Sequence, residues 1–326
     1  MPPVEVAMEL VDLSEAKRSL ERRYQNIDTG KHDAKVLAIV NGKGGVGKSS
    51  VSAAFSAALA KLGHQVLLAE LDEQGNNCED LGISNSALND RGAAQAAAIL
   101  SGKPLTPTGE ARPNLHVVPG GDELEEVVEE LYCQRRAAKS AVDPDDKTAW
   151  TLLYAAAIDN VRDKYDLIIL DVAPGSEVLQ LSALTAADYV LIPSKSDPSS
   201  RKGLRAVAKR FGAAAEVNDV LQLLGVVLFA TNSSATKVQE KIREHLEEDL
   251  NGAAPLFQQT IRHVEAAAVE ARLRGRVPQE LRNSKELPPP LQKSMGALAT
   301  DYQSLTMEIL QEMTARKNSA AAGEDA

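Results

Sequence analysis

Short apolar runs alternate with longer amphipathic or Ala-rich segments along most of the chain. Runs of Leu, Val, Ile and Ala that end at polar or glycine positions predict buried strands. The predicted strands are 35–40, 65–71, 114–118, 166–171, 189–192 and 223–231. The clearest predicted helices between them are 49–62, 122–138 and 147–162. Strands that alternate with helices predict an α/β fold, with a doubly wound, mostly parallel sheet flanked by helices.

The two ends of the chain differ from this pattern, so we expect three parts: an N-terminal helical extension (1–34), a main domain (35–316) and a disordered tail (317–326). In the extension, Leu13, Leu20 and Tyr24 share one face of a short predicted helix. Asp12 and Glu15 before and within it have the spacing of a capping box. This helix either packs on the main domain or docks a partner or second subunit, and the sequence leaves both open. The tail is small and polar, which is typical of disorder.

Composition narrows the class of protein. The 326 residues are 44% hydrophobic and 25% charged, as in soluble globular proteins. We expect a cytoplasmic location, because there is no secretory signal, no apolar run long enough to span a membrane, and no CxxC spacing between Cys78 and Cys133. The net charge of −10 argues against a uniformly basic nucleic-acid coat, but not against a local basic patch.

The most informative segment is residues 41–50, Asn-Gly-Lys-Gly-Gly-Val-Gly-Lys-Ser-Ser. It contains the phosphate-binding pattern G-x-x-x-x-G-K-[ST] between a predicted strand and a predicted helix. Glycines let the backbone turn its N–H groups toward phosphate, and the helix N-terminus favours the anion. Lys48 should reach the β- and γ-phosphates, and Ser49 should hold Mg²⁺. The predicted nucleotide-binding residues here are Gly42, Gly44, Gly45, Val46, Gly47, Lys48, Ser49 and Ser50.

Two carboxylates follow other predicted strands. Asp72 comes after 65–71, and Asp171 ends 166–171. Parallel α/β sheets bind ligands at the carboxyl ends of their strands, so we expect both side chains near the phosphate loop. Asp171 has the position of a Walker B carboxylate, which together with Ser49 would lie next to Mg²⁺.

Lys43 adds a second signal, because an ordinary phosphate loop does not require a lysine there. The run Lys43–Ser49 resembles the deviant Walker A motif of the ParA/MinD family of ATPases, most of all the ParA-type DNA partition ATPases, and residues 183–193 resemble the same proteins. The resemblance extends from about Lys35 to about Pro278. It implies an ATP- and Mg²⁺-dependent homodimer in which Lys43 reaches the nucleotide of the partner subunit. It also implies that Asp72 positions the attacking water and that Asn232 contacts adenine.

The chain departs from the family pattern near both carboxylates. Glu70 stands where the family usually has aspartate, Glu73 where it usually has proline, and Val172-Ala173-Pro174 replaces the usual sequence after Walker B. These departures leave the hydrolysis rate and the switch details open.

Surface charge separates the branches of this family. MinD-like members bind membranes through a basic amphipathic C-terminal helix, but residues 291–313 contain only one lysine and three acids, so we expect no membrane partner. ParA-like members bind DNA without sequence preference. The candidate DNA-binding residues are Arg201, Lys202, Arg205 and Lys209, which share one stretch of helix, and Arg262, Arg272 and Arg274, which form a second cluster with Arg276. A third basic group is Lys237, Lys241 and Arg243.

The resemblance therefore implies an ATPase that dimerises on ATP, binds DNA nonspecifically on the nucleoid, and drives plasmid or chromosome partition with a ParB-like adaptor that stimulates hydrolysis. Three alternatives remain: a positioning ATPase with a non-DNA cargo, a MinD-like membrane ATPase, or a metabolic enzyme that shares this phosphate loop. Among metabolic enzymes, an iron-protein reductase needs paired cysteines, which Cys78 and Cys133 do not provide.

Overall fold

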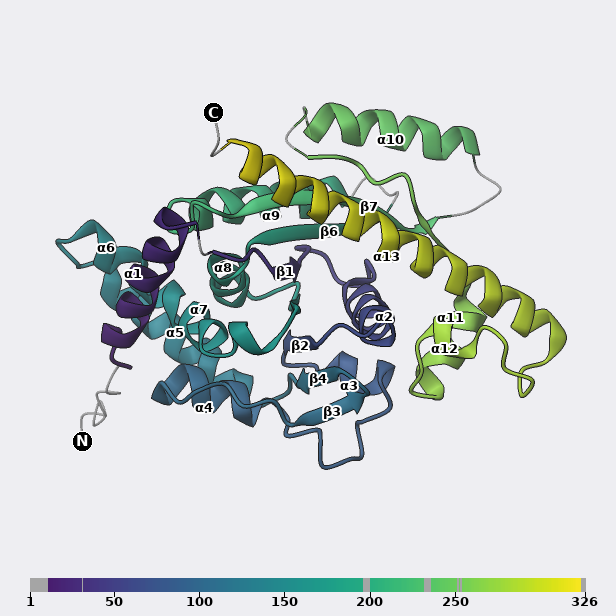
Figure 1. The fold of residues 1–326 in the computed structure, drawn as a ribbon, viewed down its shortest axis with the longest axis horizontal. Helices are drawn as coiled ribbons and strands as arrows, with labels where there is room; N and C mark the ends of the chain where they lie inside the picture. The colour runs from purple at the N-terminus through teal and green to yellow at the C-terminus, as the bar shows by residue number, and fades with distance from the viewer. Residues whose placement is uncertain are drawn as a thin grey trace, which may run out of the picture.

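The computed structural model describes residues 11–30, 32–195, 200–231, 236–250, 252 and 254–323. These residues form a sheet of eight strands in the order β3-β4-β2-β5-β1-β6-β7-β8 (Figure 1). The strands are β1 (Val36–Ile39), β2 (Val66–Leu71), β3 (Gly109–Arg112), β4 (Leu115–Val118), β5 (Leu167–Val172), β6 (Tyr189–Lys195), β7 (Gln222–Thr231) and β8 (Ile261–Arg262). Only the β3–β4 pair is antiparallel, so the predicted doubly wound, mostly parallel sheet is confirmed.

Helices cover both faces of this sheet. The helices that precede β6 are α1 (Ser14–Asp28), α2 (Lys48–Lys61), α3 (Asn76–Asp80), α4 (Ala93–Ser101), α5 (Leu124–Ala138), α6 (Pro144–Thr148), α7 (Leu152–Asp159) and α8 (Glu177–Ala186). Two short 3₁₀ helices, η1 (Ala149–Thr151) and η2 (Arg162–Lys164), lie among them. The later helices are α9 (Ser200–Ala215), α10 (Thr236–Leu250), α11 (Glu265–Leu273), α12 (Pro278–Leu281) and α13 (Pro289–Gly323).

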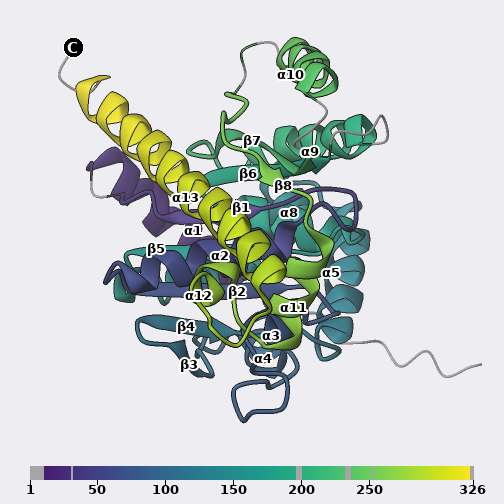
Figure 2. The same ribbon diagram turned by 90° about the vertical axis from the view of Figure 1, so that its right-hand side faces the viewer.

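The alternation of side chains along each strand divides the core into two layers. On β1, Val36 and Ala38 join a core with α5, α7 and α8, whereas Leu37 and Ile39 join a second core with α2 and α13. Figure 2 shows α13 crossing the second face diagonally. The buried face of α13 includes Leu298 and Ile309, so this helix is part of the core. No helix in the described part of the chain is long and apolar enough to cross a membrane.

The register places the functional strand ends side by side. Asp171 of β5 is level with Ile39 of β1 on one side and with Glu70 of β2 on the other. The segments that follow β1, β2 and β5 therefore emerge together at one edge of the sheet, as expected for a doubly wound fold.

The predicted N-terminal helix is present as α1, and it packs against α7. Arg23 is buried on this contact and donates to Asp159 Oδ1 at 2.8 Å and to the Thr185 carbonyl at 2.8 Å. The capping box does not form: Asp12 accepts from the Ser14 N–H at 2.9 Å, while Glu15 pairs with Arg18 and Arg22. The structure thus shows the packing role that the sequence left open.

A network of buried charges lies at the opposite end of the strands from the phosphate loop. Asp188, just before β6, accepts from the N–H groups of Lys35 (2.7 Å) and Val36 (2.8 Å), from Arg162 Nη1 (2.8 Å) and from His32 Nε2 (2.9 Å). Burial alone would raise the pKa of Asp188, but the Arg162 guanidinium and the His32 hydrogen bond hold it well below its usual range. This carboxylate fastens the start of β1 to β6.

Three segments differ from the sequence prediction. The antiparallel edge strand β3 was not predicted, because its residues Gly-Glu-Ala-Arg lack apolar alternation. The predicted helix 147–162 is broken into α6, η1 and α7, because Pro144 and the acids after it start a separate short helix. Residues 317–323, predicted as part of a disordered tail, continue α13, since their alanines are strong helix formers and Lys317 pairs with Asp33 at 2.8 Å.

Candidate functional site

The phosphate loop joins β1 to α2 through glycines in unusual backbone conformations. Gly45 has φ of 68° and Gly47 has φ of 89°, both in the left-handed region. A Cβ at Gly47 would also lie 2.2 Å from the Phe229 ring, so no other residue fits there. The α2 N-terminus has no side-chain cap, and its first N–H groups therefore remain available to an anion.

Lys48 lies between the two predicted carboxylates. Its side chain is almost fully buried. Burial lowers the pKa of Lys48, while the negative charges of Asp171 and Asp72 act in the opposite direction. The ammonium therefore stands in a low-dielectric site where a phosphate would be strongly attracted to it.

Asp171 is deeply buried, with 1% of its surface exposed. It accepts from Asn77 Nδ2 at 2.7 Å and from the Ser49 hydroxyl. Burial raises the pKa of Asp171 to about 6, although Ser49 and Lys48 oppose the shift. Among the described residues, its Oδ1 and the Oδ1 of Asn77 are buried without a hydrogen-bond partner. Buried oxygens without partners are rare, and one of these belongs to the carboxylate that contacts Ser49.

These groups fit a magnesium ion held together with a nucleotide. The described residues contain no cluster of three His, Cys, Asp or Glu side chains that could hold a metal alone. Mg²⁺ usually binds through one or two protein oxygens, and phosphates and waters complete its shell. The Ser49 hydroxyl and the Asp171 carboxylate are such a pair, and the unpartnered Asp171 Oδ1 is a free oxygen beside them.

The segment that follows β2 and begins with Asp72 is held in place by contacts with backbone groups. Asp72 is 6% exposed, and its Oδ1 accepts from the Gln74 N–H at 3.0 Å. Gly120 packs directly behind it, because a Cβ there would lie 2.2 Å from the Asp72 carbonyl oxygen. Asp72 is thus brought to the same cavity as Lys48, as the sequence predicts.

Glu70, the residue that departs from the family pattern, lies beneath this segment. Its Oε1 accepts from the Asn77 N–H at 3.0 Å, and its Oε2 from the Gly120 N–H at 3.4 Å. Burial and the nearby Asp171 charge raise the pKa of Glu70 well above its usual range. The longer side chain therefore connects the start of α3 to the loop after β4.

A cavity of about 500 Å³ opens beside the phosphate loop, a size typical of small-molecule sites. Sequence reasoning missed several of its lining residues, among them Lys195, Phe229, His263 and Tyr302. Lys195 ends β6, so its position after a parallel strand was a usable signal. Tyr302 comes from α13, far along the chain, and hydrogen-bonds with Ser50, a contact that no local pattern predicts.

The segment around Lys43 is fixed by Asn41 and by α9. Asn41 Oδ1 accepts from the Lys43 N–H at 2.9 Å, and Asn41 Nδ2 donates to the Pro193 carbonyl at 2.7 Å. Gly203 of α9 packs onto this turn, because a Cβ at 203 would lie 2.5 Å from Asn41 Oδ1 and 3.5 Å from Lys43 Cβ. The phosphate loop and α9 are therefore in direct contact.

The predicted basic face of α9 is partly described. Arg205 and Lys209 are exposed, whereas the side chains of Arg201 and Lys202 lie outside the described part of the structure. The neighbouring Arg210 donates to Gln180, whose Nε2 donates to the carbonyls of Ala173 (2.7 Å) and Pro174 (2.9 Å) after Asp171. This helix is connected to both the phosphate loop and the Asp171 loop.

Three of the four arginines of the second predicted basic group are already paired with acids, and among the described residues Arg276 donates only to the Glu280 carbonyl. Arg262 donates two hydrogen bonds to Asp301, and Arg272 donates two to Asp80. Arg274 pairs with Glu270 and Glu286. These ion pairs neutralise much of the charge that the sequence suggested for DNA.

The third basic group is only partly described. Lys241 is exposed, Arg243 donates to the Phe257 carbonyl at 2.9 Å, and the Lys237 side chain lies outside the described part of the chain, as does Asn232, the predicted adenine contact. The cysteines are separate as well: Cys78 is buried, and burial raises its pKa to about 12, while Cys133 is half-buried. They form no pair of thiolates for a cluster.

Comparison with known proteins agrees with this geometry. Residues 34–223 match the model of the family described as "AAA domain". The chromosome-partitioning ATPase Soj of Thermus thermophilus is 30% identical over 217 residues, which is 65% of this chain and 77% of that protein. The chromosome partitioning protein ParA of Caulobacter vibrioides is 29% identical over 219 residues, covering 65% and 76% of the two chains.

Solved structures share the fold at lower identity. Apo McdA from Cyanothece has a TM-score of 0.64 at 19% identity, over 82% of this chain and 99% of that one. Cobyrinic acid a,c-diamide synthase from Mycobacterium smegmatis, with bound ADP and magnesium, has a TM-score of 0.56 at 22% identity, over 74% and 92%. At this identity the likeness concerns the fold alone.

Proposed function

Because the chain belongs to the AAA domain family and, within it, to the ParA/MinD P-loop ATPases, we propose that it is a ParA-type ATPase that binds ATP with Mg²⁺ and hydrolyses it slowly unless a partner stimulates it. One observation carries this proposal: the glycine loop, Lys48, Ser49 and Asp72 line one cavity, and the buried Asp171 accepts a hydrogen bond from Ser49. Each supplies a part that phosphoryl transfer requires.

The roles of these residues follow from their surroundings. The backbone N–H groups of the glycine loop and Lys48 bind the phosphates and offset their negative charge. Ser49 and Asp171 hold Mg²⁺, which supplies charge neutralisation at the phosphate oxygens when bound. Asp72, fixed by the Gln74 N–H, orients the attacking water. Catalysis of this kind depends mainly on position and charge, so the rigid backbone around these groups supports it.

We also propose that ATP joins two subunits through Lys43. The family role of this lysine is to reach the nucleotide of the partner subunit, and the Asn41 and Gly203 contacts hold its backbone next to Gly44, which lines the cavity. The adenine contact proposed for Asn232 belongs to the same arrangement.

DNA binding is proposed at the α9 face, on Arg201, Lys202, Arg205 and Lys209. The exposed Arg205 and Lys209 support this choice, because the arginines 262, 272 and 274 are engaged by acids and would contribute less. A dimer doubles the phosphate contacts and so raises affinity for any DNA sequence. The cellular role would be plasmid or chromosome partition on the nucleoid with a ParB-like adaptor.

The test uses two pairs of charge reversals in an Asp72→Ala background, which should retain ATP and stay dimeric. Light scattering with ATP and Mg²⁺ should report a dimer, and random-sequence duplex DNA should bind it at low salt. Arg205→Glu with Lys209→Glu should weaken DNA binding at least tenfold on every sequence. The control pair Lys103→Glu with Lys164→Glu makes the same change of charge at exposed positions elsewhere.

Three results would refute parts of this proposal. A monomer in the presence of ATP would exclude the dimer. Absence of DNA affinity at low salt, with ATP bound, would exclude DNA as the cargo surface. Equal losses in the α9 pair and the control pair would mean that only total charge matters and that α9 is not the contact surface.

A further inference from the structure

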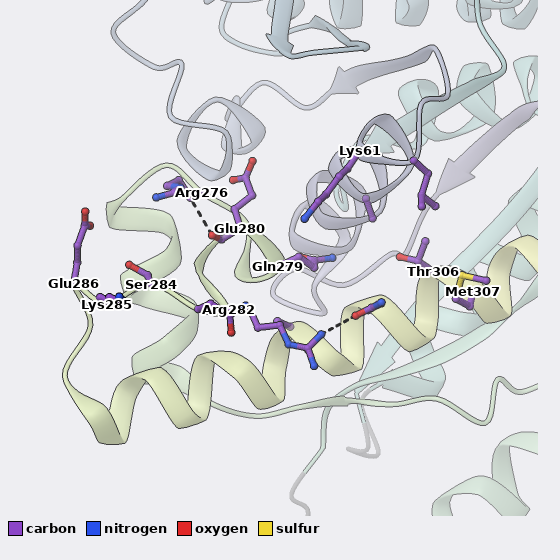
Figure 3. Close-up of a pocket in the computed structure, with 15 residues that line it drawn as sticks. Lys61, Arg276, Gln279, Glu280, Arg282, Ser284, Lys285, Glu286, Thr306 and Met307 are labelled. Atoms are coloured by element: carbon purple, nitrogen blue, oxygen red, sulfur yellow. Dashed lines mark hydrogen bonds between the residues drawn. The ribbon is translucent and has the colours of Figure 1, made fainter.

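A second hollow, of about 880 Å³, lies away from the nucleotide cavity, between the C-terminal end of α2, α12 and α13 (Figure 3). The phosphate loop is at the other end of α2. That helix has 14 residues, so the two sites are about 20 Å apart along it. The proposed ATPase function makes no use of this hollow.

The lining of the hollow carries surplus positive charge. Lys61, Arg276, Arg282 and Lys285 are all exposed around it, and the structure gives none of them an ion pair among the described residues. Arg282 donates only to the neutral Gln303, at 2.9 Å, and Arg276 only to the Glu280 carbonyl, at 3.4 Å (Figure 3).

Two acids also line the hollow, but cations outside its lining engage them. Glu280 Oε1 lies 2.6 Å from Arg112 Nε, and Glu286 Oε2 lies 2.7 Å from Arg274 Nη1. These two acids therefore do not neutralise the four cations of the lining. The hollow carries positive charge on a chain whose net charge is −10.

Apolar side chains complete the surface. Leu62 is 61% exposed and Met307 is 48% exposed, and both line the hollow. They are two of the six large apolar side chains that the described residues expose. Exposed apolar groups next to polar ones are typical of protein-interaction sites, and methionine adapts readily to different partners.

We propose that this hollow binds an acidic peptide segment of a partner protein, with an apolar side chain of that segment placed against Leu62 and Met307. Carboxylates of the segment would pair with Arg276, Arg282, Lys61 and Lys285. The two arginines can form bidentate hydrogen bonds with a carboxylate. Duplex DNA fits less well, because the charged phosphates along its outer edge would lie against Leu62 and Met307, which prefer an apolar side chain. The net charge of −10 disfavours an acidic segment over most of the surface, apart from this hollow and the basic face of α9.

The experiment uses the full-length protein and a fluorescein-labelled peptide of Glu-Asp-Leu repeats, with binding followed by fluorescence anisotropy. The wild type should bind it, and a matched peptide of Gln-Asn-Leu repeats should bind at least tenfold more weakly. Arg282→Glu with Lys285→Glu should weaken binding of the acidic peptide at least tenfold, as should a rise to high salt. Leu62→Ser with Met307→Ser should weaken it severalfold at constant charge.

The pair Lys103→Glu with Lys164→Glu is the matched control, since it makes the same charge change outside the lining. Thermal unfolding of every variant checks that each is folded, and ATP binding should be unchanged in all of them. Equal binding by the Arg282/Lys285 and control variants would overturn the proposal. So would random-sequence duplex DNA that displaces the peptide and shows the same dependence on Arg282 and Lys285, because the hollow would then be a nucleic-acid site. Neither result would alter the ATPase proposal, which rests on a different cavity.

Discussion

Asp171 and Asp188 are both fully buried carboxylates beside the central strands, yet their surroundings are opposite. Asp188, at the start of β6, receives four hydrogen bonds, two of them from Arg162 and His32. Asp171, at the end of β5, receives hydrogen bonds from Asn77 and Ser49 and keeps one buried oxygen without a partner. The pKa of Asp188 is held below its usual range, while burial raises the pKa of Asp171 to about 6.

The difference distinguishes a structural carboxylate from one prepared for a ligand. All the hydrogen-bonding capacity and charge of Asp188 are used within the fold, so it stabilises the native state on its own. One oxygen of Asp171 has no partner within the described part of the fold. The free-energy cost of burying this charge would be offset only when a cation binds beside Ser49 and the phosphates. Perturbed pKa values in a cavity are typical of functional groups, and the unpartnered oxygen supports the role in Mg²⁺ binding that we propose for Asp171.

The largest expected effect comes from removing the charge of Asp188. Asp188→Asn should lower the free energy of unfolding by about 3 to 5 kcal/mol, because it removes the fully buried carboxylate that pairs with Arg162 and His32 and leaves Arg162, among the described residues, only its longer ion pair with Asp159. Urea unfolding measures this change. Asp171→Asn should instead raise the free energy of unfolding at pH 7, because it removes a buried charge whose folded-state pKa is raised. If both substitutions destabilised the protein equally, the contrast between the two carboxylates would be lost.

The cations next to the two carboxylates, Lys48 near Asp171 and Arg162 paired with Asp188, allow a second comparison. Lys48→Ala should weaken ATP binding at least 100-fold, or about 3 kcal/mol, because it removes the buried charge that faces the phosphates. Arg162→Met should leave ATP affinity within about threefold of wild type while it lowers stability, since Arg162 pairs with Asp188 and Asp159 and does not line the nucleotide cavity. Calorimetric titration with ATP gives the affinities. Unchanged ATP binding by the Lys48→Ala protein would show that the site is wrongly assigned.

The smallest expected effect is a pH dependence of opposite sign for the two groups, in protein without nucleotide. Asp171 has a raised folded-state pKa, so the folded state holds its proton more tightly and stability falls as the pH rises from about 4 to about 6. Asp171→Asn should therefore gain on the wild type across this range, by roughly 1 to 3 kcal/mol at pH 7. Asp188 has a lowered pKa, so its contribution is present above pH 3.8 and is lost as the pH falls further. A constant difference between wild type and Asp171→Asn from pH 4 to 7 would contradict the assignment.

Much of the fold could be predicted because its signals are local. The buried strands, the glycine loop between strand and helix, and the strand-end carboxylates Asp72 and Asp171 all follow from short stretches of sequence. Parallel strands bring their carboxyl ends to one edge, so a local pattern also predicted that Ser49 and Asp171 would meet.

The remaining features depend on contacts between distant segments. Arg272 pairs with Asp80 across 192 positions of the chain, and Tyr302 reaches Ser50 from α13, so neither contact has a sequence pattern. The basic group of Arg262, Arg272 and Arg274 looked free only because its acidic partners were unknown. For the N-terminal helix, the sequence showed an amphipathic face, but only the structure shows that Arg23 inserts toward Asp159 and α7.

Gly203 has no side chain, and its close packing means that the phosphate loop and α9 cannot change independently at this point. Its backbone lies against Asn41 and the Cβ of Lys43, so a methyl group at 203 would displace the turn that carries the signature lysine. Variation that reshapes α9 to suit a new surface partner must therefore keep the phosphate loop in place. A complete substitution scan should find position 203 among the least tolerant on α9, while Arg205 and Lys209, a short distance along the same helix, accept changes that alter what the surface recognises and leave the loop intact.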